Sequence, residues 1–169
     1  MKLRFPYLGL FSFLFAFAGI SPHYVSAQDL SDQVIIRRTA YGVPHIKADN
    51  MQAAGFALAY VQLEDYGRGI VDGMVKARGE WTRFHDLNTD ERPLSIDRDA
   101  SSKIQYARAL ETFPLLKKET QDILVGFAKG MNRYIERHKN EFPEWVKPDF
   151  TGYDVHARDV GSMEGGSVQ

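Results

Sequence analysis

The sequence predicts an α+β fold that is mostly helical and contains one β-hairpin. A β-branched cluster, Val34 to Ile36, is followed by a glycine-proline turn and a short alternating stretch, which is the pattern of two paired strands. Further along, apolar residues recur at intervals of three and four over residues 114–138. That spacing is typical of the buried face of one helix.

Residues 1–27 form a separate segment that we interpret as a secretory signal peptide. A positively charged start precedes an apolar run over residues 8–20, and Val25 and Ala27 stand at the two positions that a signal peptidase reads. The apolar run has about 13 residues, whereas a membrane-spanning helix needs about 20. We therefore expect cleavage between Ala27 and Gln28, no membrane anchor after processing, and export of residues 28–169 to the periplasm or the medium.

The mature chain is predicted to begin with the hairpin. Residues 33–39 suit a strand, Ala40–Gly42 a turn, and Pro44–Ala48 a return strand that places His45 and Lys47 on one face. A two-stranded hairpin is marginally stable by itself. We therefore expect this hairpin to join a larger sheet.

Two longer helices should follow. Residues 51–78 are rich in alanine and start after a good N-cap, although the glycines at 67 and 69 predict a kink or a break. Gly79 is placed to cap the end of this segment. The clearest helix covers residues 114–138, with Pro114 in its first turn.

The remaining segments carry weaker signals. Residues 88–102 are polar, include a proline, and predict a loop with about one helical turn, and residues 103–113 predict a short helix. Residues 140–153 contain two prolines and a tryptophan, and we expect an irregular aromatic loop there.

Composition excludes some classes of function. The leader carries two of the 21 basic residues and none of the 22 acidic ones, so its removal takes the net charge from −1 to −3. With no run of basic residues, nucleic acid is not an expected partner. The chain has no cysteine, which excludes a thiol nucleophile or a zinc–thiolate site within these residues.

No spacing argument identifies an active site. The mature chain has four histidines, none spaced with another ligand as in H-E-x-x-H. His45 follows a proline in a strand, and we expect it to make a structural hydrogen bond. The pair Asp97-x-Asp99 lacks the glycine and distal glutamate of a calcium loop, so we expect both carboxylates to be solvated.

Two stretches together resemble a known family. The segment "IIRRTAYGVPHIKADNMQAAGFALAYVQLEDYGRGIVDGMVKARGEWTRF" (35–84) resembles the start of the α-subunit of penicillin amidase-type N-terminal nucleophile hydrolases. The segment "GFAKGMNRYIER" (126–137) resembles a glycine-asparagine helix of the same family. Within the family, "RTAYGVPHI" and "ARGEWTRF" are most similar to the acyl-homoserine lactone and lipopeptide acylases.

The resemblance implies a site that is completed by another chain. In this family one precursor gives an α-subunit and a larger β-subunit that together form an αββα sandwich, and autoproteolysis frees a serine at the start of the β-subunit. The α-amino group of that serine acts as its base, because an α-amine titrates near ~7.7–8.0 and can be neutral at working pH. No catalytic residue is therefore expected in this chain. Any calcium ion bound by the complete enzyme would take its α-subunit ligand from beyond Gln169.

The resemblance also implies an activity and a candidate pocket. We expect deacylation of N-acyl homoserine lactones, with a penicillin, cephalosporin or cyclic lipopeptide acylase as the alternative. A non-catalytic exported binding module is a second alternative. By the family pattern "VGSMEGGSVQ" (160–169) corresponds to a helix lining the acyl pocket. Met163 matches an apolar pocket position, and Ser167 stands where β-lactam acylases carry a bulky aromatic side chain.

The first prediction concerns the length of the acyl chain. The small residues Gly165, Gly166 and Ser167 should leave room for a longer chain than phenylacetyl, so a Ser167→Phe variant should lose activity on long acyl chains more than on short ones. The measurement is the rate of amide hydrolysis by the full-length enzyme across a series of acyl lengths. Identical length profiles for wild type and variant would contradict the assignment.

Overall fold

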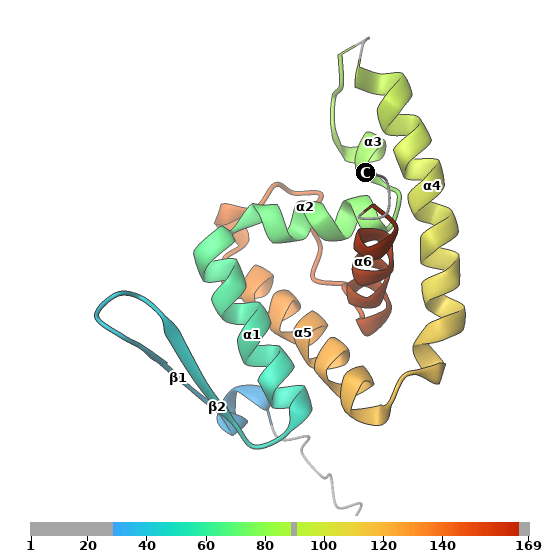
Figure 1. Cartoon of the computed structure of the whole chain (residues 1–169). Coiled ribbons are helices and arrows are strands. Elements are labelled where there is room, and N and C mark those ends of the chain that lie inside the picture. Colours follow the sequence, from blue (N-terminus) through green and yellow to red (C-terminus); the bar gives the residue numbers. More distant parts are fainter. Residues whose placement is uncertain (1–28, 89–90, 166–169) are drawn as a thin grey trace, which may run out of the picture.

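The computed structural model describes residues 29–88 and 91–165, with side chains up to residue 159. The predicted signal cleavage between Ala27 and Gln28 lies outside the described residues. The described elements are, in order, η1 (Leu30–Gln33), β1 (Val34–Arg38), β2 (Pro44–Ala48), α1 (Met51–Tyr66), α2 (Arg68–Ala77), α3 (Trp81–Phe84), α4 (Glu91–Thr112), η2 (Phe113–Leu115), α5 (Lys118–Arg137), η3 (Lys139–Glu141) and α6 (Gly152–Gly165) (Figure 1).

The predicted fold class is confirmed, and the hairpin lies where the sequence places it. Strands β1 and β2 pair antiparallel with Ile36 opposite Ile46. Gly42 closes the turn with a φ of 80°, a conformation that glycine adopts without strain. The inner residues of the hairpin pack on α1, whereas His45 is exposed on the outer face.

The helices that follow confirm the predicted caps. The Asn50 side-chain oxygen accepts a hydrogen bond from Ala53 N at 2.9 Å and starts α1. Gly67, with φ 53°, separates α1 from α2 and so confirms the predicted interruption. At the end of α2, Gly79 N donates to Lys76 O and Glu80 N donates to Val75 O, which is the Schellman arrangement.

The centre of the fold is a very close contact between α1 and α5. A Cβ atom added to Gly126 would lie 1.9 Å from Gln52 O, and one added to Gly130 would lie 2.2 Å from Phe56 O. From the other side, a Cβ on Gly55 would lie 2.1 Å from Ile123 O. The two helix backbones therefore touch, and only residues without a side chain fit at these three positions.

Around this contact the two helices contribute most of the hydrophobic core. The remaining core residues come from α2, η2, the segment before α6, and α6 itself. The buried core cluster comprises Ala59, Leu63, Ile70, Val71, Met74, Phe113, Leu124, Phe127, Ala128, Met131, Tyr134, Ile135, Val146, Phe150 and Val155.

The largest correction concerns residues 88–102. The predicted polar loop is wrong from Glu91 onward, because α4 runs without interruption from Glu91 to Thr112. The start of α4 has a local sequence signal that was not used in the prediction. The Asn88 side-chain oxygen accepts a hydrogen bond from Glu91 N at 2.9 Å, as in a helix N-cap. Few of its residues are buried, so the apolar periodicity that predicts a helix is weak.

Asp99 of α4 corrects a second expectation, because it is buried and not solvated. The side chain is 5% exposed. Its carboxylate accepts hydrogen bonds from Trp81 N at 3.1 Å and from Thr82 N at 2.8 Å, and so caps the short helix α3. Asp97 on the same helix is exposed, as expected.

The end of the chain differs in smaller ways from the prediction. Helix α5 begins at Lys118, and Pro114 lies in the preceding 3₁₀ turn η2 instead of the first turn of the helix. Residues 140–151 are largely irregular, as predicted, apart from the end of η3. Helix α6 then begins at Gly152.

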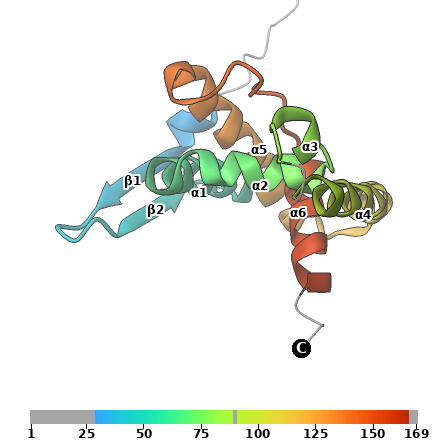
Figure 2. The same cartoon turned by 90° about the horizontal axis from the view of Figure 1, so that it is seen from above.

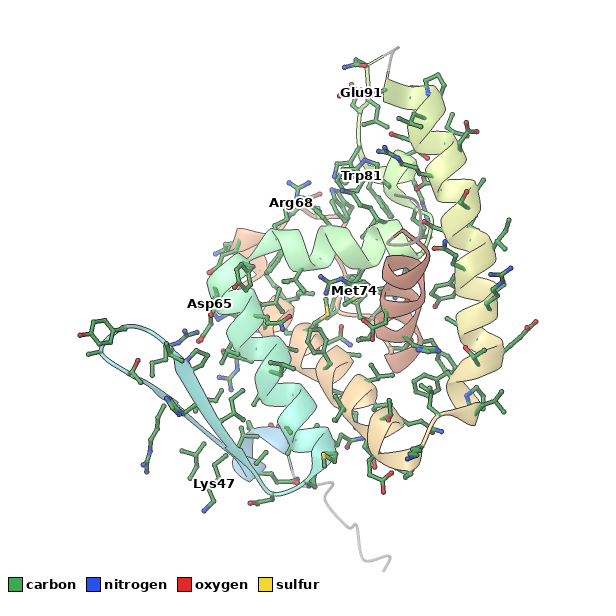
Figure 3. The ribbon with its side chains drawn as sticks, in the orientation of Figure 1. Lys47, Asp65, Arg68, Met74, Trp81 and Glu91 are labelled. Carbon is green, nitrogen blue, oxygen red and sulfur yellow. The ribbon has the colours of Figure 1, made fainter. Side chains whose placement is uncertain are left out.

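Figures 1 and 2 both place the hairpin at one end of the molecule and α4 at the other. An ion pair fixes the hairpin to α1: Arg38 Nη2 lies 2.8 Å from Glu64 Oε2 and 2.9 Å from Asp65 Oδ1. Arg38 Nη1 also donates to Gly42 O at 2.9 Å, so one guanidinium holds the turn and the end of α1 together. Figure 3 labels Asp65 at this position.

The contact between α1 and α5 gives the second prediction. Gly126→Ala should lower the free energy of unfolding of the full-length protein by about 1–3 kcal/mol, or prevent its accumulation, because the added methyl group overpacks the interface. Gly69→Ala is the matched control, since nothing lies within 4 Å of its added Cβ and alanine favours a helix. Urea unfolding measures both variants, and equal midpoints would contradict the packing argument.

Candidate functional site

One of the two predicted pocket residues falls within α6. Met163 lies in the last part of this helix, although its side chain is outside the described residues. Ser167 is outside the described residues altogether. What the structure establishes is the set of contacts that holds the first half of α6, and this set fixes where the helix points.

Helix α6 starts with a reciprocal cap between Thr151 and Asp154. The Asp154 carboxylate oxygen Oδ2 accepts hydrogen bonds from Thr151 N at 2.6 Å and from Thr151 Oγ1 at 2.8 Å. In turn, Asp154 N donates to Thr151 O at 3.1 Å. A carboxylate in the first turn also interacts favourably with the positive end of the helix dipole.

The same carboxylate forms a buried ion pair with Arg78, at the end of α2. Arg78 Nε donates to Asp154 Oδ1 at 2.6 Å, and Nη2 donates to Oδ2 at 2.9 Å. Asp154 is fully buried, and the Arg78 side chain is 21% exposed. A bidentate guanidinium–carboxylate pair fixes direction as well as distance, so α6 is held relative to α2.

Two further residues complete this network. Tyr106 of α4 donates its hydroxyl proton to Asp154 Oδ1 at 3.0 Å. Asp149, in the segment before α6, accepts from Arg78 Nη1 at 3.0 Å and, through its carbonyl oxygen, from Nη2 at 3.2 Å. The Asp154 network therefore joins α2, α4, the segment before α6 and α6 itself.

The electrostatics of the Asp154 network favour charged partners. Burial alone would raise the pKa of Asp154, but the hydrogen bonds and positive charge of Arg78 outweigh it and lower that pKa. Burial would likewise lower the pKa of Arg78, and its bonds to Asp154 and Asp149 raise it instead. Burial and the neighbouring Asp154 charge raise the pKa of Tyr106 to about 12, so its hydroxyl keeps its proton as a donor.

The result is a helix with one fixed end and one projecting end. Helix α6 packs against α2, α4 and α5. In Figure 2 its far end stands out from the rest of the helices. The end of α6 on which Met163 lies therefore projects from a rigid base.

The sequence reading did not identify Asp154, Arg78 or Tyr106. A local signal existed for one of them, because Thr151-x-x-Asp154 has the spacing of a capping box. Arg78 and Tyr106 have no local signal. They reach Asp154 across 76 and 48 residues of sequence, a distance over which spacing patterns carry no information.

The histidines do not form a nucleophile–base pair in the described part of the chain. Thr112 Oγ1 lies 2.9 Å from His156 Nε2, but this hydroxyl already donates its proton to Arg108 O at 2.9 Å. His156 therefore donates to Thr112 and cannot accept its proton. The His45 side chain is exposed and makes no hydrogen bond with the described part of the chain, so the expected structural hydrogen bond of its ring is not found there.

The His85 side chain is likewise held by structural contacts. Its Nδ1 lies 3.0 Å from Trp81 O, which only accepts, so Nδ1 carries the proton. The lone pair of Nε2 faces Arg68 Nη2 at 3.1 Å. The ring stacks on Trp81 and meets Trp145 edge to face, and these contacts join α3 to the irregular segment.

The described part of the chain offers neither a grouped metal-ligand set nor a membrane-spanning helix. Within the described residues, no three His, Asp or Glu side chains are grouped so that they could hold a metal ion. None of the described helices combines the length and the apolar character that crossing a membrane requires.

The sequence is similar to a known family and to curated proteins. Residues 33–162 match the family described as penicillin amidase. The chain is 32% identical over 158 residues to the acyl-homoserine lactone acylase PvdQ of Pseudomonas fluorescens (strain Pf0-1), covering 85% of this chain and 19% of that protein. It is 33% identical over 131 residues to aculeacin-A acylase of Actinoplanes utahensis, covering 68% of this chain and 16% of that protein. The chain thus spans about a fifth of these relatives' length.

A solved structure supports the fold. A thermostable penicillin G acylase from Alcaligenes faecalis matches with a TM-score of 0.64 and 24% sequence identity. The match covers 79% of this chain and 73% of the solved chain. The two chains therefore share a fold and are similar in length.

The Asp154 network gives the third prediction. Arg78→Met should lower the free energy of unfolding of the full-length protein by about 3–5 kcal/mol at pH 7, because it leaves a buried carboxylate without its cation. Arg83→Met is the control, since Arg83 pairs with Glu80 at the surface with a 70% exposed side chain. That variant should change stability by less than about 1 kcal/mol.

The pH dependence of the free energy of unfolding tests the ion-pair account. Asp154 has a lowered pKa in the folded protein. Its contribution is therefore fully present above the unfolded value of about 3.9, and it is lost as the pH falls through the folded pKa. In Arg78→Met the unpaired carboxyl has a raised pKa, so its cost disappears on acidification. Urea unfolding should give a smaller difference between wild type and variant at pH 4.5 than at pH 7, and a larger difference would contradict the ion-pair account.

Proposed function

The chain belongs to the penicillin amidase family, and from that premise we propose that it is the α-subunit of an exported amide hydrolase that deacylates N-acyl homoserine lactones. One observation carries the choice of substrate: the 32% identity to an acyl-homoserine lactone acylase over 85% of this chain. The fold shared with the solved penicillin G acylase chain supports the assignment to this class of enzyme.

In the proposed mechanism, the nucleophile is the N-terminal serine of the β-subunit. Its hydroxyl oxygen attacks the amide carbonyl carbon while its own neutral α-amine takes the hydroxyl proton. The C–N bond then breaks, the proton passes to the leaving amine of homoserine lactone, and an acyl-serine ester remains. Water hydrolyses this ester to release the fatty acid and restore the serine. Hydrogen-bond donors of the β-subunit stabilise the oxyanion.

In this scheme the α-subunit supplies one wall of the acyl pocket. Helix α6 carries Met163, whose flexible thioether suits an aliphatic chain, and Ser167 follows it. The network of Asp154 with Arg78 and Tyr106 holds the base of α6. A pocket wall positioned by a buried, hydrogen-bonded base keeps its geometry better than one on a loop. Arg78 and Asp154 are thus positioning residues in the proposal.

A second candidate substrate is a cyclic lipopeptide. The 33% identity to aculeacin-A acylase favours it, and it differs from the first candidate in the leaving amine and not in the bond that breaks. A penicillin or cephalosporin is a weaker candidate, because the match to penicillin G acylase is a likeness of fold. No structural observation favours the binding module.

The fourth prediction tests the proposed function on the full-length protein expressed with its leader. The purified protein should consist of two chains, with the smaller one beginning at Gln28 by mass spectrometry. It should release homoserine lactone from long-chain N-acyl homoserine lactones at least tenfold faster than it hydrolyses penicillin G. An aculeacin-type lipopeptide is assayed in parallel.

The outcomes separate the candidates. Faster hydrolysis of the lipopeptide would replace the proposed substrate with the alternative. A single unprocessed chain that binds acyl compounds without cleaving them would overturn the enzyme proposal in favour of a binding module. Replacement of the serine that starts the second chain by alanine serves as the inactive control.

A further inference from the structure

A small cleft opens where the helices α2, α4 and α6 meet. Each of these helices contacts the other two, and Figures 1 and 2 agree in placing them side by side. The cleft has a volume of about 190 Å³. Its polar lining residues are Lys76 of α2, Ser102 and Gln105 of α4, and Arg158 of α6. We call it the Arg158 cleft.

The lining of the Arg158 cleft carries positive charge on two sides. Lys76 and Arg158 come from different helices, and none of the described residues that line the cleft is acidic. The charge of Arg158 acts on Asp159, the next residue, and opposes the rise that burial causes in the pKa of Asp159. Asp159 does not line the cleft, so the cleft itself is a place of positive potential.

Neither of the two cations has a carboxylate partner in the described part of the chain. Other cations of this chain are paired, for example Arg68 with Asp72 at 3.3 Å, but Lys76 and Arg158 form no ion pair with a described carboxylate. Arg158 is also partly buried. A cation that loses water on burial needs a compensating partner, and an anion in the cleft can supply one.

Neighbouring residues hold both cations in place. Lys76 Nζ lies 4.1 Å from the centre of the Trp81 ring, which is a cation–π distance; Figure 3 labels Trp81 beside α4. Arg158 lies across Gly73, where an added Cβ atom would be 3.3 Å from Arg158 Nε. Because the two charges are positioned in advance, a ligand that binds between them has less conformational entropy to remove.

We propose that the Arg158 cleft binds a small oxyanion, a phosphate or a carboxylate, between Lys76 and Arg158. A guanidinium donates two parallel N–H bonds to two oxygens of such a group, and an ammonium adds a compact charge. The Ser102 hydroxyl on the α4 wall can donate to a further oxygen. This binding site goes beyond the proposed function and does not depend on it.

A bound oxyanion would also connect two helices of the fold. Lys76 belongs to α2, and Arg158 follows Asp154 on α6 by four residues, about one helical turn. The ligand would therefore join α2 to α6 one turn beyond the Arg78–Asp154 pair. Since a ligand that binds only the folded protein stabilises it, the oxyanion should raise the unfolding midpoint.

Two sources could supply the oxyanion, namely free phosphate and the fatty acid that the proposed reaction releases. The cleft continues past Lys76 and Ser102 into a hollow of about 440 Å³ that is also lined by Asp97 and Arg98. A long aliphatic tail would lie beside these two charged side chains, and burial of charge against an apolar chain is unfavourable. The lining therefore favours a small hydrophilic anion, and inorganic phosphate is the probe.

The fifth prediction concerns phosphate binding by the full-length protein. Titration calorimetry at constant ionic strength, with chloride as the balancing anion, should give saturable binding of inorganic phosphate. Arg158→Gln and Lys76→Gln should each raise the dissociation constant by about tenfold or more, because each removes one charged donor. Arg83→Gln is the matched control, since Arg83 is 70% exposed and pairs with Glu80, and it should change the constant by less than about twofold.

Each outcome of this titration decides a point. Absence of saturable phosphate binding to the wild type would overturn the proposal, and so would unchanged affinity in Lys76→Gln, a variant of an exposed side chain that should fold normally. Octanoate is titrated in parallel, and tighter binding of octanoate that is lost in the same two variants would assign the site to the fatty acid instead of phosphate. Failure of the proposed function would appear separately, as a wild-type protein that does not hydrolyse N-acyl homoserine lactones.

Discussion

The backbones of α1 and α5 touch where Gly55, Gly126 and Gly130 remove the side chains that would separate them. The other elements are placed relative to that pair. The hairpin packs on α1, α2 continues from α1 beyond Gly67, and α6 packs on α5. A side chain at any of the three glycines would push the helices apart and shift every element that depends on them.

The Asp154 network acts on this framework in a different way from the core. Apolar packing is not directional and tolerates small rotations of one helix against another. The bidentate pair of Arg78 and Asp154 tolerates little rotation, because both carboxylate oxygens are held by fixed donors. A buried ion pair is weak evidence for net stability. In this fold its clearer effect is to define the direction of α6, the helix on which Met163 lies.

The parts of the fold that were predictable are those with local causes. The hairpin, its turn at Gly42, the Asn50 cap and the Gly67 break each follow from residues within a few positions of one another. Helix α4 was not predicted because it is mostly exposed, and Asp99 was misassigned because its partners, Trp81 and Thr82, lie 18 and 17 residues away. In the candidate site, the family resemblance pointed to Met163 and Ser167, whereas the network behind α6 depends on long-range contacts.

The contact between α1 and α5 also sets an order of assembly. Gln52 and Gly126 are neighbours in space but lie 74 positions apart in the sequence (126 − 52), so a long loop must close before the core exists. During synthesis, α1 emerges well before the helix that buries its apolar face. Until α5 is complete, the buried face of α1 has no partner and the native core cannot form. The glycine contact that fixes the final structure is thus also what delays folding.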